Sequence, residues 1–422
     1  MSVGAWDHAE GPPAGAASAW RLALAAAAVA MLATYSQGFV FPLFGDGARM
    51  VASGGIIRLM FFPAYAVGVV LIAGAPVATL RAMARQPFLI LVLLMVAVSL
   101  AWSVAPDQTS RRAFAVYLTT FSGIGLAVRY RWAQLAEILG ACFALLGLLS
   151  LLTCLLVPSI GVMRELFPGA WRGLWAEKNA FGGNMGLGVV VLAAAALLNP
   201  PRARLWAGMA ALLLGLVLMS TSKTALVSLM LGLGALGLTA FAQLGPAAGV
   251  VAVWIAVMGL GLATGVLLFA ADAVFGLLGK DPTLTGRTKI WAAVMRQIAE
   301  RPWTGYGYGA VWTETGNWGP LAWIVKDAGF RPQHAHNTWI EQWLGQGVVG
   351  LAAFAMTYMQ TLTLAVLAVF RSRGALLAVP LLVVYTLMTL TESVGLVYND
   401  MRWVMFVAVA VKLAWPDDRI EE

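Results

Sequence analysis

Residues 247–270 read AAGVVAVWIAVMGLGLATGVLLFA and contain no charged side chain. A helix needs about 20 consecutive apolar residues to cross the hydrocarbon core of a bilayer, so this run predicts a transmembrane helix. Runs of the same kind recur along almost the whole chain of 422 residues, which is 61% hydrophobic and 11% charged, with a mean hydropathy of +0.83. This composition excludes a soluble domain and predicts an all-α, polytopic membrane protein.

The apolar runs predict about twelve transmembrane helices, nine before residue 270 and three after residue 344. Residues 1–19 are polar, small and proline-bearing, without the charged start and cleavage pattern of a signal peptide. We therefore expect a disordered cytoplasmic tail there, and a second short tail at 416–422. The predicted helices lie near residues 20–43, 56–79, 88–105, 113–127, 134–157, 182–198, 206–221, 224–242, 247–270, 344–370, 375–391 and 400–415.

The arginines predict the orientation of these helices. By the positive-inside rule, loops rich in arginine face the cytoplasm, and here such loops alternate along the chain, which also places both termini inside. Arg111 and Arg112 oppose the rule, so charge does not fix the topology of the hairpin at 88–127. The net charge of +8 reflects these loops and an anionic substrate, and does not indicate a nucleic acid partner. The arginines of the inner loops are Arg81, Arg85, Arg129, Arg131, Arg202, Arg204, Arg371 and Arg373.

A long connection at 271–343, on the outer side, interrupts the series of helices. Connections of this length are functional or disordered, and this one contains too many tryptophans for disorder. Its segment 285–300 predicts an amphipathic helix that begins at a Thr285 cap and ends before Pro302. Such a helix can lie on the bilayer surface, and it can also present Arg287 to a substrate phosphate. The glycines of 305–309 then predict a flexible, aromatic turn.

Three further cations are predicted on the same outer side as Arg287. Arg172 and Lys178 lie in the glycine-bearing stretch 171–183, and Lys223 lies in a polar break between two apolar runs. For Lys223 the alternative is a lysine that snorkels to the interface without a substrate. Two or more cations are needed to hold a pyrophosphate and to stabilise the charge that develops on it as a leaving group.

Acidic residues lie on this side too. For the cluster at 398–402 and the neighbouring Glu392 we expect a structural ion pair that links helices, either Asp400 with Arg402 or Glu392 with Arg402.

His334 and His336 are two of only three histidines, and they stand beside Asn337 at the start of a predicted helix. A metal site would need further ligands at a recognisable spacing, which neither the carboxylates nor the two cysteines provide, so no metal is predicted. The other two interpretations are a structural histidine bonded to backbone carbonyls and a general base. Histidine suits proton transfer near neutral pH, which favours His336 as the base, with His334 and Asn337 in support.

Several motifs, in order along the chain, resemble the O-antigen ligase and polymerase superfamily. One departure is Lys223, where arginine is usual, because lysine keeps the charge but lacks the bidentate fork. The resemblance covers about residues 170–400, and its motifs are the Gly/Lys-Asn motif at 171–182, Ser-Thr-Ser-Lys-Thr at 220–224, the loop segments 285–291 and 301–307, and the histidine motif with His336-Asn337 and Gly347-Val-Val-Gly350.

The resemblance implies a metal-independent, inverting glycosyltransferase of the GT-C-like type without a cofactor, placed in the bacterial inner membrane with a periplasmic active site. Its donor would be a glycan on undecaprenyl pyrophosphate. His336 would activate the acceptor hydroxyl, Arg287 and Lys223 would hold the departing pyrophosphate, and Arg172 and Lys178 would bind the donor.

The acceptor distinguishes the possible members of this superfamily. The run at 177–182 looks more like exopolysaccharide polymerases, which transfer to another lipid-linked repeat unit. A ligase, which transfers to lipid A–core, and transfer to protein stay open. A flippase or exporter without chemistry is the alternative from another class, and it would distribute charges through the spans. Membrane lipids, a chain-length regulator and a flippase of the same pathway are the implied partners.

Overall fold

The computed structural model describes residues 14–45, 47–269, 286–313 and 318–415. The predicted tail at 416–422, most of that at 1–19 and the predicted cap at Thr285 lie outside the described residues. Regular structure in the described part is helical, and its β pairing is limited to an isolated bridge between Val162 and Trp171. The all-α prediction is therefore confirmed.

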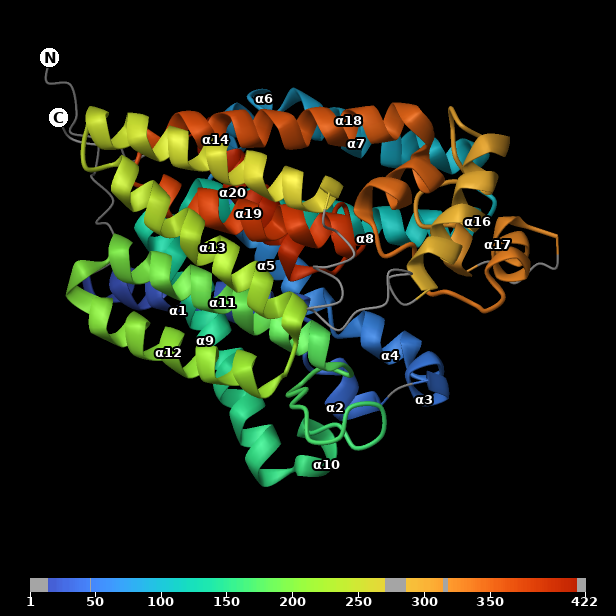
Figure 1. Ribbon diagram of the computed structural model, residues 1–422, viewed down its shortest axis with the longest axis horizontal. Coiled ribbons are helices and arrows are strands. Elements are labelled where there is room, and N and C mark those ends of the chain that lie inside the picture. Colours follow the sequence, from blue (N-terminus) through green and yellow to red (C-terminus); the bar gives the residue numbers. More distant parts are fainter. Residues whose placement is uncertain (1–13, 46, 270–285, 314–317, 416–422) are drawn as a thin grey trace, which may run out of the picture.

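Most long helices lie roughly parallel to one another along the long axis of the molecule (Figure 1). Several smaller helices, α16 and α17 among them, lie at one end of this bundle. The bundle consists of α1 (Ala14–Tyr35), α5 (Phe62–Ala73), α7 (Pro87–Val98), α8 (Pro106–Arg129), α9 (Trp132–Leu156), α11 (Lys178–Leu198), α12 (Ala203–Met219), α13 (Lys223–Ala242), α14 (Pro246–Phe269), α18 (Thr338–Val369), α19 (Ala375–Thr391) and α20 (Met401–Ala414). The other described helices are α2 (Val40–Phe44), α3 (Gly47–Ala52), α4 (Gly54–Leu59), α6 (Pro76–Ala84), α10 (Pro158–Gly161), α16 (Arg287–Glu300), α17 (Pro320–Ala328), η1 (Ser99–Trp102), η2 (Pro200–Arg202) and η4 (Val311–Thr313).

Seven helices of the described chain are long and apolar enough to cross a membrane. An eighth span results if α6 and the α7–η1 segment, which are bent by 93°, count as one. Each of the twelve predicted intervals contains a helix, and α1 begins at Ala14, earlier than predicted. The chain is thus a polytopic, integral membrane protein, whereas the number of twelve spans and their orientation stay predictions.

Helix α20 occupies the centre of the bundle. Every residue from Trp403 to Leu413 is buried, and the helix packs against α8, α18 and α19. From Trp403 to Val411 the sequence is apolar on all sides, as expected of a helix without an exposed face. The contact with α8 is close, since a Cβ at Gly123 would stand 2.7 Å from the carbonyl oxygen of Val404.

The hairpin at 88–127 contains the two arginines that oppose the charge rule, Arg111 and Arg112. Helix α8 begins at Pro106, so Arg111 and Arg112 belong to its early turns rather than to a loop. The Arg112 guanidinium donates to the carbonyl of Gly309 and lies over the ring of Tyr398, 5.4 Å from its centre. Arg112 thus makes a tertiary contact at the end of the bundle that carries α16.

Helices α16 and α17 form a small cap on that end. Ile290, Val294 and Ile298 of α16 are buried in an apolar cluster that also contains Ile324 of α17 and Leu344 of α18. The periodicity predicted this apolar face correctly. However, this apolar face packs against α17 and α18. A helix lying on the bilayer surface, which the sequence left open, would bury the same face in lipid.

The segment 302–309 fills a break in α18. Gly347 has φ 67° and ψ −173°, which interrupts the helix, and Gly307 and Tyr306 donate their N–H groups to the carbonyls of Gly345 and Leu344 at 2.8 and 3.0 Å. On the other side of the break, Val348 donates to the carbonyl of Pro302. Gly305, Gly307 and Gly309 all have positive φ, so the predicted turn is a buried, hydrogen-bonded wedge.

Candidate active site

The histidine turn enters α18 at the capped end of the bundle. The Asn337 side-chain oxygen accepts from the N–H groups of Trp339 and Ile340 at 2.9 and 3.1 Å, so Asn337 is the N-cap of α18. Its amide also donates to the carbonyl of Leu390 in α19, at 3.2 Å. Asn337 thus supports the turn by fixing the start of α18 to the end of α19.

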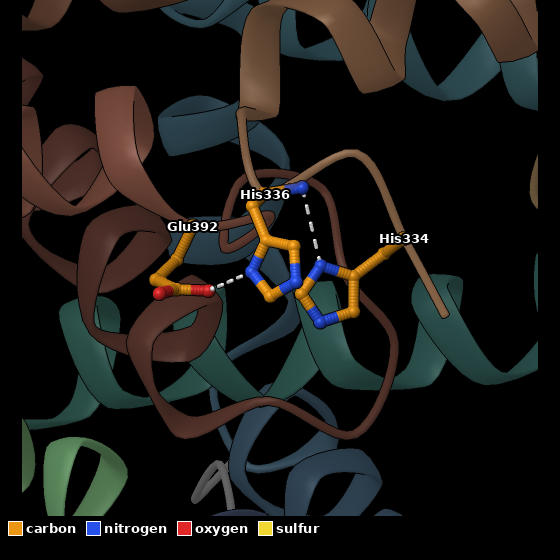
Figure 2. Close-up of side chains that lie close together, drawn as sticks. All are labelled: His334, His336 and Glu392. Atoms are coloured by element: carbon orange, nitrogen blue, oxygen red, sulfur yellow. Dashed lines mark hydrogen bonds and ion pairs between the residues drawn. The ribbon is translucent and has the colours of Figure 1, made fainter. Parts of the chain in front are cut away.

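Glu392 connects His336 with Arg287. One carboxylate oxygen lies 2.9 Å from Nδ1 of His336 and the other 2.8 Å from a terminal nitrogen of Arg287, whose second terminal nitrogen donates to the carbonyl of Thr391 (Figure 2 shows the histidine–carboxylate contact). Burial alone would raise the pKa of the Glu392 carboxyl, but the hydrogen bond from His336 and the charge of Arg287 outweigh it and lower the pKa below its usual range. Glu392 is therefore a carboxylate near neutral pH.

An ionised Glu392 determines which nitrogen of His336 carries the proton. A carboxylate accepts only, so Nδ1 must donate, and the lone pair of a neutral imidazole is then on Nε2. The His336 side chain retains 31% of its exposure and that of Glu392 37%, so the pair is accessible from outside. The arrangement provides an oriented base.

His334 lies directly beside this base. The two imidazole rings are 3.9 Å apart between centres, and Nδ1 of His334 accepts the backbone N–H of His336 at 3.2 Å (Figure 2). Burial, followed by the proximity of His336, lowers the pKa of His334 to about 4. His334 is thus neutral near pH 7 and acts as an acceptor for the backbone of its neighbour.

Of the two pairings expected for Arg402, the one with Asp400 is confirmed and the one with Glu392 is wrong. Arg402 pairs with Asp400, with contacts of 2.5 to 3.2 Å, while Glu392 pairs with Arg287 and His336. Asp400 also caps α20, so its ion pair lies within one helix start and does not link two helices. The sequence carried no signal for the role of Glu392, because 56 positions separate it from His336.

The remaining predicted cations lie at the same end, near the start of α11. Lys178 donates to the Thr221 hydroxyl at 3.2 Å and lies over the ring of Phe167, and its charge interacts with that of Lys223. These residues are the first of α11 and α13, where the helix dipoles favour an anion. The structure therefore brings Lys178 and Lys223 together.

Arg172 has a different setting. Its guanidinium donates to the carbonyls of Ile160, Ser159 and Ala176 at 2.7, 3.3 and 3.5 Å and lies 4.3 Å from the centre of the Phe41 ring. These contacts secure the loop that precedes α11.

Helices α11 and α19 link the lysines to the histidine site. A Cβ at Gly183, in the early turns of α11, would stand 3.6 Å from the side chain of Met388. Met388 is one turn before Glu392, whose N–H donates to the Met388 carbonyl at 2.7 Å. The two groups of polar residues are thus neighbours.

His334, His336 and Glu392 also meet a simple criterion for a metal site, since one potential ligand atom from each lies within 4.8 Å of the others. The sequence showed no third ligand, and the fold supplies one. However, Arg287 already neutralises Glu392, and a guanidinium at this distance repels a divalent cation. The prediction that the site needs no metal stays a prediction.

Fold and site define a class: a polytopic helical membrane protein with an oriented histidine and several cations at one end. Residues 208–355, which run from α12 into α18 and include Lys223, Arg287 and both histidines, match the O-antigen ligase family. The exopolysaccharide production protein ExoQ of Rhizobium meliloti (strain 1021) is 30% identical over 273 residues, which are 61% of this chain and 60% of ExoQ. The match thus spans less than two thirds of that relative. Both findings bear out the resemblance of this chain to the O-antigen ligase and polymerase superfamily.

Proposed function

We propose that the protein is a polysaccharide polymerase of the bacterial inner membrane. It transfers a glycan from undecaprenyl pyrophosphate to a hydroxyl of another lipid-linked repeat unit at the periplasmic face. The observation that carries this proposal is the shared carboxylate: Glu392 holds both His336, which can accept a proton, and Arg287, which can face a phosphate. The similarity to ExoQ, an exopolysaccharide production protein, supports a product of this kind.

The reaction needs one base and one stabilised leaving group. Nε2 of His336 takes the proton of the acceptor hydroxyl while its oxygen forms a bond to the anomeric carbon. The bond from that carbon to the pyrophosphate oxygen breaks on the opposite face, so the configuration inverts. The imidazolium that results is stabilised by Glu392, and its proton passes to water after product release.

Arg287 and Lys223 hold the departing undecaprenyl pyrophosphate. The interactions are strongest when negative charge develops on the leaving group, and they therefore lower the barrier rather than only binding the donor. Lys178, close to Lys223, contributes to donor binding. Arg172 is the least supported of the predicted donor ligands, because its guanidinium holds the loop before α11 and lies over the ring of Phe41, whereas Arg287 shares the carboxylate that orients His336.

Two other functions remain as alternatives. A ligase that transfers the glycan to lipid A–core uses the same site, and the family matched by residues 208–355 is described as O-antigen ligase. A flippase or exporter is less supported, because the ionisable side chains of the candidate site lie at one end of the bundle and do not line a passage through it.

Replacing His336 by alanine tests the proposal directly. We expect the initial rate of polymer formation to fall by a factor of about 100 or more, the usual contribution of a general base. The assay uses purified protein and the lipid-linked oligosaccharide that accumulates in a deletion strain, with a chelator present throughout, because no metal is required.

The matched controls lie on α16. Arg287→Ala should lose a similar factor, as for other groups that stabilise a developing anion. Arg296→Ala removes another arginine of the same helix, which forms a surface ion pair with Asp327. It should leave the rate unchanged, because a surface ion pair contributes little. Normal polymer from purified, folded His336→Ala protein would contradict the catalytic assignment.

A further inference from the structure

The carboxylate of Glu341 receives three hydrogen bonds from three separate segments. One oxygen accepts the backbone N–H of Ala335 at 3.0 Å and the hydroxyl of Ser393 at 3.2 Å. The other accepts the indole N–H of Trp312 in η4. Glu341 itself is fixed on the first turns of α18. A carboxylate is the side chain that suits this position, because all three partners donate.

Two of the three partners of Glu341 adjoin the base and the group that orients it. Ala335 stands between the two histidines, and Ser393 directly follows Glu392. The Glu341 carboxylate therefore holds the His334–His336 turn and the segment after α19 at a fixed separation. The 2.9 Å contact between His336 and Glu392 joins the same two segments.

We infer that Glu341 is a positioning residue that keeps His336 and Glu392 in register without touching the substrate. The inference rests on the proposed function, in which this pair is the base. The alternative is an acidic residue that only stabilises the N-terminus of α18 through the helix dipole. The two differ in their effect on the chemical step, since a displacement of about 1 Å in a reacting group can reduce the rate about 100-fold.

Glu341→Gln is the decisive variant because it keeps the shape and replaces one acceptor oxygen by a donor. We expect kcat to fall by at least about tenfold, while KM for the lipid-linked oligosaccharide changes less than about twofold, because Arg287 and Lys223 are untouched. Asp327→Asn is the matched control, a carboxylate of the same cap paired with Arg296. It should alter neither constant.

A second variant tests the geometry of the contact. In Glu341→Gln the new NH₂ group must face one of three donors, and removal of the Trp312 donor relieves that conflict. Trp312→Phe alone should reduce kcat about threefold, and Trp312→Phe combined with Glu341→Gln should be several-fold more active than Glu341→Gln alone. If Glu341 only stabilises the N-terminus of α18, the Trp312→Phe substitution should give no such rescue.

The outcomes separate the inference from the proposed function. If His336→Ala is inactive while Glu341→Gln keeps full kcat, the positioning role is wrong and the function stands. The role is also wrong if kcat and KM change together and Trp312→Phe gives no rescue. If His336→Ala is fully active, the proposed function itself fails. Should Glu341→Gln not fold, Ser393→Ala decides: a several-fold lower kcat at constant KM supports the role, and an unchanged kcat overturns it.

Discussion

His336 adopts a backbone conformation that is costly for a side chain of its type. Its φ is +52°, in the left-handed region, which costs about 1 kcal/mol or more for a residue other than glycine. Two interactions offset this cost: the backbone N–H donates to His334, and the ring contacts Glu392. The contacts that orient the imidazole as a base therefore also stabilise its strained backbone. A substitution that removes either contact should both shift the backbone of His336 and lower its reactivity.

His334 makes the protein sensitive to acid. Its pKa is lowered to about 4 in the folded chain, against 6.5 for an ordinary histidine. Between these values the unfolded chain binds a proton that the folded chain does not. Stability is thus full above about pH 6.5 and declines as the pH falls toward 4. At pH 5 this contribution amounts to about 2 kcal/mol. The charged and titratable groups that face His334 are His336, Glu392, Arg402 and Arg287.

His334→Asn should remove that part of the pH dependence. Asparagine can accept the N–H of His336 but cannot titrate, so the variant should lose less thermal stability than the wild type between pH 7.5 and pH 5. The measurement is thermal unfolding of the purified protein in detergent at both values. An equal loss in the two proteins would show that other groups cause the acid sensitivity.

Among the elements, α18 depends on a glycine at its break. Gly347 has φ 67° and ψ −173°, a combination that is essentially restricted to glycine, and a Cβ there would stand 2.0 Å from the carbonyl oxygen of Trp303. For Gly347, the close neighbour is the 302–309 segment.

Gly347→Ala should therefore destabilise the protein by about 3 kcal/mol, the sum of an unfavourable φ and an overpacked contact. Gly237→Ala on α13 is the control, since nothing lies within 4 Å of a Cβ there and alanine favours the helix. The comparison is between apparent Tm values of the two variants. Equal values would mean that the break in α18 can rearrange at little cost.

The elements also show how far sequence patterns reach. Apolar runs located every long helix, because length and hydrophobicity suffice for that purpose, and the apolar periodicity of 285–300 identified the buried face of α16. His336, Lys223 and Arg287 were identified as candidate site residues because their side chains suit the chemistry and stand in short sequence motifs. Glu392 and Glu341 were not, because their roles depend on contacts between segments far apart in the chain, which carry no local signal.

At the scale of the whole molecule, polar chemistry and apolar packing are separated. The centre of the bundle around α20 is tightly packed, whereas His336 lies just before α18, Glu392 just after α19, and Glu392 pairs with Arg287 at the start of α16. A lipid-linked donor suits this division, because its polyprenyl chain can stay among the exposed apolar helix faces while its pyrophosphate reaches the cations. The architecture thus supports a lipid-linked donor but does not distinguish between acceptors.

The acceptor can be identified from what a deletion strain accumulates. A polymerase joins repeat units before export, so its loss should remove surface or secreted polysaccharide and leave single lipid-linked repeats. A ligase acts after polymerisation, and its loss should instead leave long undecaprenyl-linked chains beside bare lipid A–core. We expect the first pattern on gels of whole-cell and lipid extracts. A plasmid copy of the gene should restore the polysaccharide. A copy with His336→Ala should not restore it, because the variant protein is inserted in the membrane but lacks the catalytic base. The second pattern would assign the same site to the ligase reaction.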